Sequence, residues 1–385
     1  MRRQEFEITA GDTYLNGAYC SPLPRVCRAA VADGYALKTS PERIGDGLFF
    51  EWPDAIRARL AALLGLPADE IGVTTSTGFG ALQIAQGLPW EHGDRMLIGP
   101  DEFPSNVYPW LALEARGVQV EPIGTRGYPL SPADLELALA RPGRVRALTV
   151  AAVHYVSGDL QSLDVFAGAL HARDAWLVVD GAQAAGAIAL DWRALGVDAL
   201  MVSGYKWTLG PYGVGALWVR PALRDVLLDV NGNWQASPRA HDFARIMDDY
   251  PRGVVPHGRR FDVGETASFL NLAAWRASLD WLLSIGVAAT EAHHRRLQDR
   301  LVAGLAGLPL EPVTALDRPH RSPVLMLAPR AGLDAAALAA ALAARHVHVS
   351  ARGGRLRLSP GLWNDLDDVD AGLAALHDAV AAARA

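Results

Sequence analysis

Short runs of hydrophobic residues alternate with helix-like segments between residues 70 and 220. Most of the runs are nearly continuous, which is typical of strands that helices cover on both faces. The segments between them, such as "SPADLELALA" (131–140) and "LDVFAGALHARD" (163–174), carry apolar residues at helical spacing. This alternation predicts an α/β fold with a mostly parallel, seven-stranded sheet. The predicted strands are residues 70–76, 95–100, 118–124, 146–153, 175–180, 199–204 and 213–219.

The pattern changes after residue 220, where a polar stretch rich in Asn, Pro and Arg precedes a long helical pattern near 268–305. Three short strand-like runs and two further helical patterns follow, and they predict a smaller α+β lobe. A chain of 385 residues is long for one compact core, so two lobes agree with its length. The strands of this part are expected at 322–328, 346–351 and 355–359, and the helices at about 333–345 and 366–384.

Composition narrows the possible partners. Half of the residues are apolar, the formal net charge is −6, and no dense block of Lys or Arg occurs, which argues against a nucleic-acid partner. We expect no membrane partner, since there is no uncharged apolar run of about twenty residues and no signal-peptide core near the N-terminus. Cys20 and Cys27 are too few for a disulfide scaffold, although one bridge stays possible. We therefore expect a cytoplasmic protein.

Polar residues at the ends of the predicted strands are candidate site residues, because ligands of doubly wound sheets bind outside the carboxyl ends of the strands. Asp180 ends the apolar run "LVVD", where a carboxylate is costly unless a positive group faces it. Gln183 follows three residues later, and Lys206 stands just beyond the sixth strand, ahead of a glycine-rich loop. On the alternative interpretation, Asp180 caps a turn and Lys206 is solvated.

Two more features fall at strand ends. In "TTSTGFGALQIA" (74–85), Thr77, Gly78 and Phe79 would offer a hydroxyl and backbone N–H groups to an anion at a helix N-terminus. The string has neither the lysine of a P-loop nor the dinucleotide spacing, so a plain glycine-rich helix start remains an alternative. Phe103 follows the second strand and offers either an aromatic face or a core side chain.

Together these features supply an amine, an anion cradle, a carboxylate and an aromatic face, a set that matches pyridoxal phosphate. Its aldehyde needs a lysine, here Lys206, and its ring nitrogen needs an acid, here Asp180, to stay protonated. The charged ring nitrogen would be the positive partner of Asp180. No metal site is expected, because the adjacent histidines of "EAHHRRLQDR" (291–300) do not face one another on a helix.

The string "VVDGAQAAG…DWRALGVDALMVSGYKWTLGPYGVGALWV" resembles the class V aminotransferase superfamily of fold type I pyridoxal-phosphate enzymes. Cysteine desulfurases, kynureninases and isopenicillin-N-epimerase-like proteins belong to it. "YLNGAYCSPLP", "RFDVGETASF" and "LRLSPGLWNDLDDVD" extend the resemblance over nearly the whole chain. It implies a homodimer with shared active sites. It also implies a site-forming N-terminal segment (1–25), a large cofactor-binding domain (26–265) and a small C-terminal domain (266–385).

The resemblance also implies a role for each site residue. Lys206 would form the internal aldimine and move the α-proton, Asp180 would pair with the ring nitrogen, and Gln183 would bond the phenolic oxygen. Arg357 would hold the substrate's α-carboxylate in a bidentate pair. Thr77, Gly78, Ser203 and Tyr205 would hold the phosphate, with Thr266 from the second subunit; Phe79, Phe103 and Tyr155 complete the expected cofactor site, and Asn16 and Ala18 the substrate site.

The implied reaction passes through an external aldimine and a quinonoid of an α-amino acid, by aminotransfer or by β-lyase (C–S or C–C) chemistry. Epimerisation and kynureninase-like hydrolysis stay open. Both cysteines precede residue 28, and Phe103 stands where desulfurases have a histidine, so we expect that the chain is not a cysteine-persulfide desulfurase. An alternative from a different functional class is a non-catalytic binding protein that keeps the fold. A nicotinamide dehydrogenase would need G-x-G-x-x-G after the first strand, which is missing.

Overall fold

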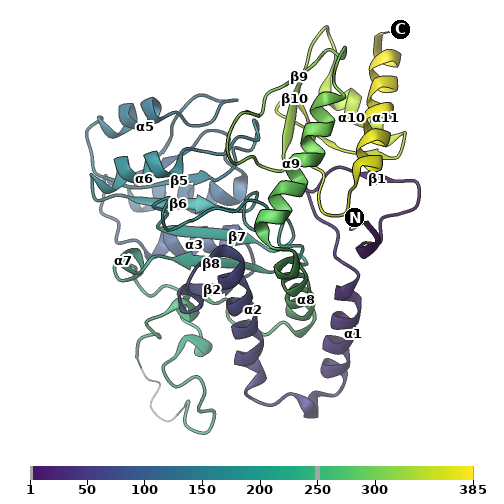
Figure 1. Cartoon of the computed structure of the whole chain (residues 1–385). Helices are drawn as coiled ribbons and strands as arrows, with labels where there is room; N and C mark the ends of the chain where they lie inside the picture. The colour runs from purple at the N-terminus through teal and green to yellow at the C-terminus, as the bar shows by residue number, and fades with distance from the viewer. Residues whose placement is uncertain (1–2, 248–251, 385) are drawn as a thin grey trace.

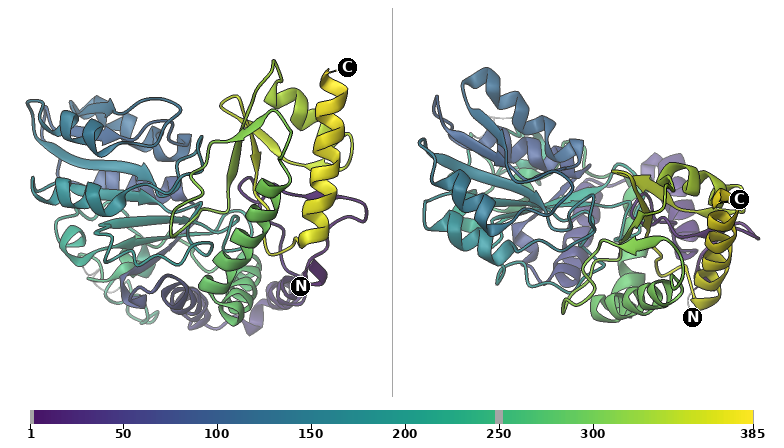
Figure 2. Two further views of the ribbon diagram at one scale, coloured as in Figure 1. Left: turned by 45° about the horizontal axis from the view of Figure 1, so that its top comes forward. Right: turned by 90° about the horizontal axis from the view of Figure 1, so that it is seen from above.

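The chain folds into two lobes, seen side by side in Figure 1 and from two further directions in Figure 2. The computed structural model describes residues 3–247 and 252–384. A large lobe contains the main sheet, and a smaller lobe carries the C-terminal helix (Figure 1). The expected division into 1–25, 26–265 and 266–385 stays a prediction. No helix of the described ranges is long and apolar enough to cross a membrane.

The main sheet has seven strands in the order β2-β8-β7-β6-β5-β3-β4. Neighbours from β4 to β7 run parallel, whereas β8 runs antiparallel to both β7 and β2. The predicted α/β fold with a mostly parallel, seven-stranded sheet is therefore confirmed, and each predicted run overlaps one strand. The strands are β2 (Ile71–Thr74), β3 (Arg95–Ile98), β4 (Gln119–Pro122), β5 (Val145–Ala151), β6 (Trp176–Asp180), β7 (Ala199–Ser203) and β8 (Gly215–Val219).

Helices cover this sheet because its central strands are apolar on both faces; every residue of β7 and β8 is buried. The helices before Gly286 are α1 (Val26–Thr39), α2 (Leu48–Leu64), α3 (Thr77–Gly87), α4 (Tyr108–Leu111), α5 (Pro132–Leu139), α6 (Leu163–His171), α7 (Pro221–Arg224) and α8 (Phe269–Ile285). Short 3-10 turns occur at Arg3–Glu5, Pro41–Arg43, Ala68–Glu70, Pro104–Asn106, Ala112–Arg116, Trp234–Ala236 and Gly258–Phe261.

The smaller lobe packs helices against a four-stranded antiparallel sheet in the order β12-β13-β10-β9. The single long helix expected near 268–305 is instead two helices, because Gly286 adopts φ +83°, a conformation that glycine takes without strain and that ends α8. The elements are β9 (Leu310–Pro312), β10 (Leu325–Pro329), β11 (Val347–His348), β12 (Ser350–Arg352), β13 (Arg355–Leu358), α9 (Val287–Ala303), α10 (Ala335–Ala343) and α11 (Leu366–Arg384).

The N-terminal segment joins the two lobes. Its strand β1 (Thr13–Tyr14) pairs in parallel with β11 of the smaller lobe, and Leu15 lies in that lobe's apolar core. A few residues later, the backbone N–H of Ser21 donates to the carbonyl of Tyr205 in the large lobe, at 3.1 Å. Figure 1 shows this purple segment beside the yellow helix α11. The first residues of the chain therefore lie against residues more than three hundred positions later.

Candidate active site

Asp180 and Lys206 lie at the carboxyl edge of the main sheet. Asp180 is the last residue of β6, and Lys206 stands three residues beyond Ser203, the last residue of β7. The turn between Ser203 and Lys206 requires a glycine, since a Cβ on Gly204 would lie 2.3 Å from a methyl carbon of Val214. Because β6 and β7 are parallel neighbours, their ends bring the acid and the amine to one place.

Burial changes the proton affinity of both groups. Asp180 is 6% exposed, and burial raises the pKa of its carboxyl, while the charge of Lys206 and a 2.8 Å hydrogen bond from the Ala182 N–H oppose that rise. Lys206 is 8% exposed, and burial lowers the pKa of its amine to about 8, against the opposing charge of Asp180. Its Nζ makes no hydrogen bond within residues 3–247 and 252–384. An amine that loses its proton near neutral pH can act as a nucleophile.

Gln183 is held by two hydrogen bonds. Its Oε1 accepts from the indole N–H of Trp207 at 2.9 Å, and its Nε2 donates to the carbonyl of Ala18 at 2.9 Å. Ala18 is held in turn by its own N–H, which donates to the hydroxyl of Ser359 at 3.0 Å. Two predicted site residues, Ala18 from the N-terminal segment and Gln183 from the large lobe, are therefore in direct contact.

The N-terminus of α3 holds three residues of the predicted phosphate site, Thr77, Gly78 and Phe79. Ser76 is the N-cap, and its hydroxyl accepts the N–H of Phe79 at 3.1 Å, so that N–H is not free for an anion. Thr77 and Gly78 are the first two helical residues, and their N–H groups have no carbonyl partner inside the helix. The hydroxyls of Thr77 and Ser203 lie 2.7 Å apart, which joins the start of α3 to the end of β7.

Aromatic rings surround Lys206. Its Nζ lies 5.7 Å from the ring centroid of Phe103 and 5.7 Å from that of Tyr205. The ring centroids of Tyr155 and Phe103 lie 5.7 Å apart. Tyr205 stacks on Tyr212, with ring centroids 4.0 Å apart. Burial raises the pKa of the Tyr205 hydroxyl. Three residues expected from the sequence therefore share one space around the lysine.

Arg357 approaches the same space from β13. It is 2% exposed, its Nε donates to the hydroxyl of Ser350 at 3.1 Å, and its guanidinium carbon lies 5.8 Å from the ring centroid of Tyr155. Its two terminal nitrogens have no hydrogen-bond partner among the described residues. Asn16 supports it indirectly, because the Ser350 hydroxyl donates to Asn16 Oδ1 at 3.1 Å. Burial lowers the pKa of the guanidinium to about 10. Arg357 thus offers a free fork to a carboxylate.

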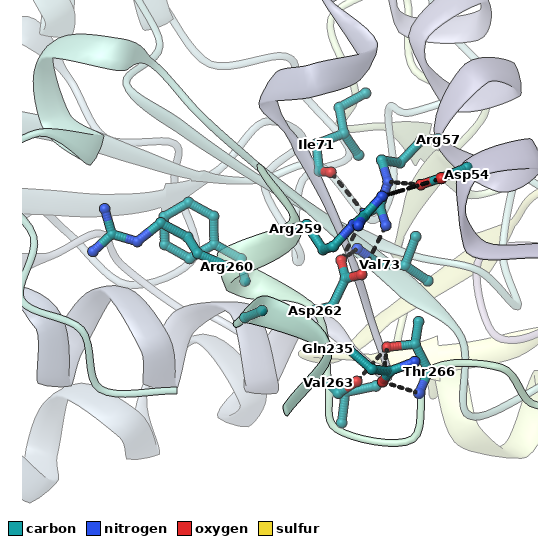
Figure 3. Close-up of polar contacts among 12 residues, drawn as sticks. Asp54, Arg57, Ile71, Val73, Gln235, Arg259, Arg260, Asp262, Val263 and Thr266 are labelled. Carbon is teal, nitrogen blue, oxygen red and sulfur yellow. Dashed lines mark hydrogen bonds and ion pairs between the residues drawn. The ribbon is translucent and has the colours of Figure 1, made fainter. Parts of the chain in front are cut away.

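Thr266 lies elsewhere in the described chain. Its hydroxyl donates to the carbonyl of Val263 and lies 3.3 Å from Oε1 of Gln235, as Figure 3 shows. Glu265, the additional residue of "GET", adopts φ +58° just before it. Within one chain the Thr266 hydroxyl is already used, so its expected contribution to a second subunit stays a prediction.

Sequence reasoning missed two residues of this site. Glu102, directly before Phe103, accepts the N–H of Ala151 at 2.7 Å and the amide of Asn106 at 2.8 Å. Burial raises the pKa of its carboxyl to about 8, and the charge of Asp180 adds to that rise. Trp207, directly after Lys206, holds Gln183. The only signal in the sequence was their position: Glu102 and Trp207 each stand directly beside a predicted site residue.

Comparison with known proteins places the chain in a family. A family model described as aminotransferase class-V matches residues 49–360. The chain belongs to the class V aminotransferase family. The expected resemblance is confirmed, and so is the fold, since a cystine C–S lyase solved with its product cysteine persulfide superposes with a TM-score of 0.84 at 21% identity, covering 96% of this chain and 98% of its own.

Two relatives show the range of this family. A probable cysteine desulfurase of Pseudomonas aeruginosa is 30% identical over 377 residues, which cover 92% of this chain and 86% of the relative. A kynureninase of Deinococcus radiodurans is 29% identical over 339 residues, covering 83% of this chain and 78% of the relative. The chain is therefore similar both to a probable cysteine desulfurase and to a kynureninase.

Pyridoxal phosphate is confirmed as the cofactor of this class V protein by its family. The residues present fit the group on their own terms: a buried acid, a buried amine that makes no hydrogen bond to the part of the chain that the structure describes, and a hydroxyl pair at a helix N-terminus. Lys206 would hold the aldehyde, Asp180 the ring nitrogen and Gln183 the phenolic oxygen. Thr77, Gly78 and Ser203 would hold the phosphate.

The expectation that the chain is not a cysteine-persulfide desulfurase is wrong. Its matched relatives include the probable desulfurase of Pseudomonas aeruginosa, and a cysteine desulfurase structure superposes with a TM-score of 0.84. The position of a cysteine along the chain does not fix its distance from the site in space. Cys20 stands between Ala18, which bonds Gln183, and Ser21, which bonds Tyr205. Cys27 is buried and lies 3.0 Å from the hydroxyl of Ser278.

Proposed function

We propose that this class V enzyme is a β-lyase that breaks the Cβ–S bond of a sulfur-containing α-amino acid. One observation carries the amino-acid part: a buried amine, Lys206, lies near a buried acid, Asp180, and near the guanidinium of Arg357, whose two terminal nitrogens have no partner among the described residues. Each part of an α-amino acid substrate would have a partner here. Its carboxylate would meet Arg357, its Cα proton would meet Lys206, and its amine would meet the cofactor that Lys206 holds. The C–S preference is supported by the desulfurase relatives and the cystine C–S lyase fold neighbour.

Each residue has a defined task in this proposal. Arg357 binds the substrate carboxylate and fixes the orientation of Cα, since a guanidinium fork matches a carboxylate at two points. Lys206 then removes the proton from Cα, which its lowered pKa makes feasible near neutral pH. When bound, pyridoxal phosphate supplies an aldehyde for the substrate amine and a ring that accepts the electron pair of Cα. Asp180 keeps the ring nitrogen protonated.

The overall reaction balances without an oxidant. Cysteine and water give pyruvate, ammonia and hydrogen sulfide, because the Cβ–S bond breaks and water replaces the amine. Cystine and water give pyruvate, ammonia and cysteine persulfide by the same steps. Neither route needs a protein thiol or a keto acid.

Desulfuration to alanine is the second candidate, and the position of Cys20 favours it. In that reaction a protein thiolate takes the sulfur, an S–S bond forms as the Cβ–S bond breaks, and Cβ is reduced. Cys20 lies two residues after Ala18, whose carbonyl accepts from Gln183, although the cavity of about 330 Å³ that Cys20 lines does not include Lys206. The charge of Lys206 lowers the pKa of the Cys20 thiol, although burial raises it overall.

A cofactor experiment tests the family chemistry. Purified protein should be yellow, borohydride should attach the chromophore to the peptide that contains Lys206, and Lys206→Ala should remove it. Protein that stays colourless after addition of pyridoxal phosphate would contradict the proposal.

A product assay separates the two reactions. Protein given cysteine or cystine without a keto acid should release pyruvate and ammonia. Alanine in place of pyruvate, lost in Cys20→Ala, would favour desulfuration. Turnover that requires a keto acid would identify an aminotransferase, and loss of optical activity without sulfur release would identify an epimerase.

We also propose a homodimer and a cytoplasmic location. Aromatic side chains around the site are unusually exposed for their type, with Tyr212 at 61% and Phe103 at 39%, which suits coverage by a second copy. Both cysteines are free, which suits a reducing compartment. Sedimentation of the purified protein tests the dimer.

A further inference from the structure

Each hydrogen-bond partner of the Gln183 side chain can act only as a donor or only as an acceptor. The indole of Trp207 has an N–H and can only donate, so the atom that it contacts at 2.9 Å must be the amide oxygen. The backbone carbonyl of Ala18 can only accept, so the atom that it contacts at 2.9 Å must be the amide nitrogen. The two partners therefore fix which end of the amide faces which way.

One N–H of the Gln183 amide remains after these two bonds are made. The nitrogen carries two N–H groups, and Ala18 takes one. Gln183 is 8% exposed, so bulk water has little access to the remaining donor. With this orientation, the side chain can offer that N–H to an oxygen of a bound group.

Trp207 is itself immobilised. It is 3% exposed, it stacks on Trp363 with an interplanar angle of 18°, and the edge of His294 packs against it at 5.0 Å. A Cβ on Gly17 would lie 3.0 Å from the ring of Trp207, so the N-terminal segment closes the remaining side. The indole cannot swing away from Gln183 without disturbing the packing between the lobes.

We propose that Trp207 is a positioning residue that, together with the Ala18 carbonyl, points the free N–H of Gln183 at the phenolic oxygen of pyridoxal phosphate. The inference rests on the proposed cofactor chemistry. A donor at that oxygen stabilises its negative charge most when the nitrogen that joins Lys206 to the cofactor is unprotonated. The donor therefore lowers the pKa of that nitrogen.

The experiment compares three variants of the yellow protein by the pH midpoint of the chromophore's colour change. Gln183→Leu removes the donor, and Trp207→Phe keeps a ring but removes the indole N–H. Trp363→Phe is the matched control, because its indole N–H donates to the Tyr14 carbonyl at 2.8 Å and not to Gln183. Thermal unfolding of all three proteins reports whether they fold.

Gln183→Leu should raise the midpoint by on the order of one pH unit, the effect of one lost hydrogen bond. Trp207→Phe should raise it in the same direction, and Trp363→Phe should leave it at the wild-type value. In the double variant Gln183→Leu/Trp207→Phe, the pH midpoint should shift no further than in Gln183→Leu alone, since both changes act through one donor.

A folded, yellow Trp207→Phe protein with the wild-type midpoint would overturn the inference, and so would a Gln183→Leu protein with an unchanged midpoint. An equal shift in Trp363→Phe would overturn it as well, because the effect would then come from packing. A wild-type protein that is colourless would instead defeat the proposed cofactor chemistry, which separates the two failures.

Discussion

Arg57 and Asp262 form a two-point ion pair in the interior of the large lobe, although 205 positions separate them in the sequence. Nη1 of Arg57 lies 2.6 Å from one carboxylate oxygen of Asp262, and Nη2 lies 2.8 Å from the other. Asp262 also accepts the N–H of Val73, and Arg57 donates to the carbonyl of Ile71 (Figure 3). The pair thereby attaches the segment before Thr266 to the edge strand β2.

Loss of one partner should destabilise the fold. Arg57→Met leaves the carboxylate of Asp262, which is 2% exposed, buried without its cation. We expect the free energy of unfolding to fall by about 3–5 kcal/mol, measured by urea denaturation. Arg59→Met is the matched control: its pair with the half-exposed Asp280 is at the surface and should contribute less than about 1 kcal/mol. Equal losses of unfolding free energy in Arg57→Met and Arg59→Met would show that burial of an ion pair does not determine how much its loss destabilises the fold.

The amine of Lys206 should titrate near pH 8 in the cofactor-free protein, because burial lowers its pKa to about 8 from the usual 10.5. The labelling rate of Lys206 by an amine-reactive reagent, read by mass spectrometry at a series of pH values, measures this midpoint. Asp180→Asn removes a negative charge that favours the protonated amine, so the midpoint should move down. Arg357→Met removes a positive charge and should move it up. Shifts in the same direction would contradict the electrostatic account.

Arg357→Lys should impair substrate binding more than cofactor binding. Lysine keeps the charge but loses the planar fork, and a charge-assisted hydrogen bond contributes about 1.5–3 kcal/mol, so KM should rise roughly 10- to 100-fold. Absorbance of the bound cofactor should stay unchanged. Arg352→Lys is the control, since its Nη1 bonds the carbonyl of Ala351. An unchanged KM in Arg357→Lys would remove Arg357 from the substrate site.

The hydroxyl pair of Thr77 and Ser203 should contribute to cofactor affinity. Thr77→Val keeps the shape and removes one donor to a phosphate, which should weaken binding of pyridoxal phosphate roughly 10-fold in equilibrium dialysis. Thr77→Ser keeps the hydroxyl and should restore most of the affinity. Wild-type affinity in Thr77→Val would mean that the phosphate lies elsewhere.

The sheet could be predicted from the sequence because its strands are buried on both faces and read as continuous apolar runs. Residues 175–180 and 199–204 contain β6 and β7 with ends displaced by at most one position. The two-residue strand β1 carries no such signal, since its pairing with β11 depends on residues at the other end of the chain. Gly286 was missed because one glycine inside a helical pattern does not reveal its φ angle.

The site was predictable where it depends on strand ends, and less so where it depends on competing local bonds. Asp180 and Lys206 follow from the ends of parallel neighbouring strands. The sequence predicts that the N–H of Phe79 is free for an anion, but the hydroxyl of Ser76 accepts it, which only the backbone geometry reveals. The Thr266 hydroxyl donates to the carbonyl of Val263 within one chain, and its contribution to a second subunit stays a prediction. Cys20 was judged by its position in the sequence, whereas the N-terminal segment brings it between two site contacts.

The contact between Ala18 and Gln183 also has a consequence for synthesis on the ribosome. Residues 13–18 are made long before residues 347–359, which hold them. A nascent chain that has already completed β6 and β7 therefore has Asp180 and Lys206 but no docked N-terminal strand to hold Gln183. The N-terminal segment can therefore close over Gln183 only after residues 347–359 have been made.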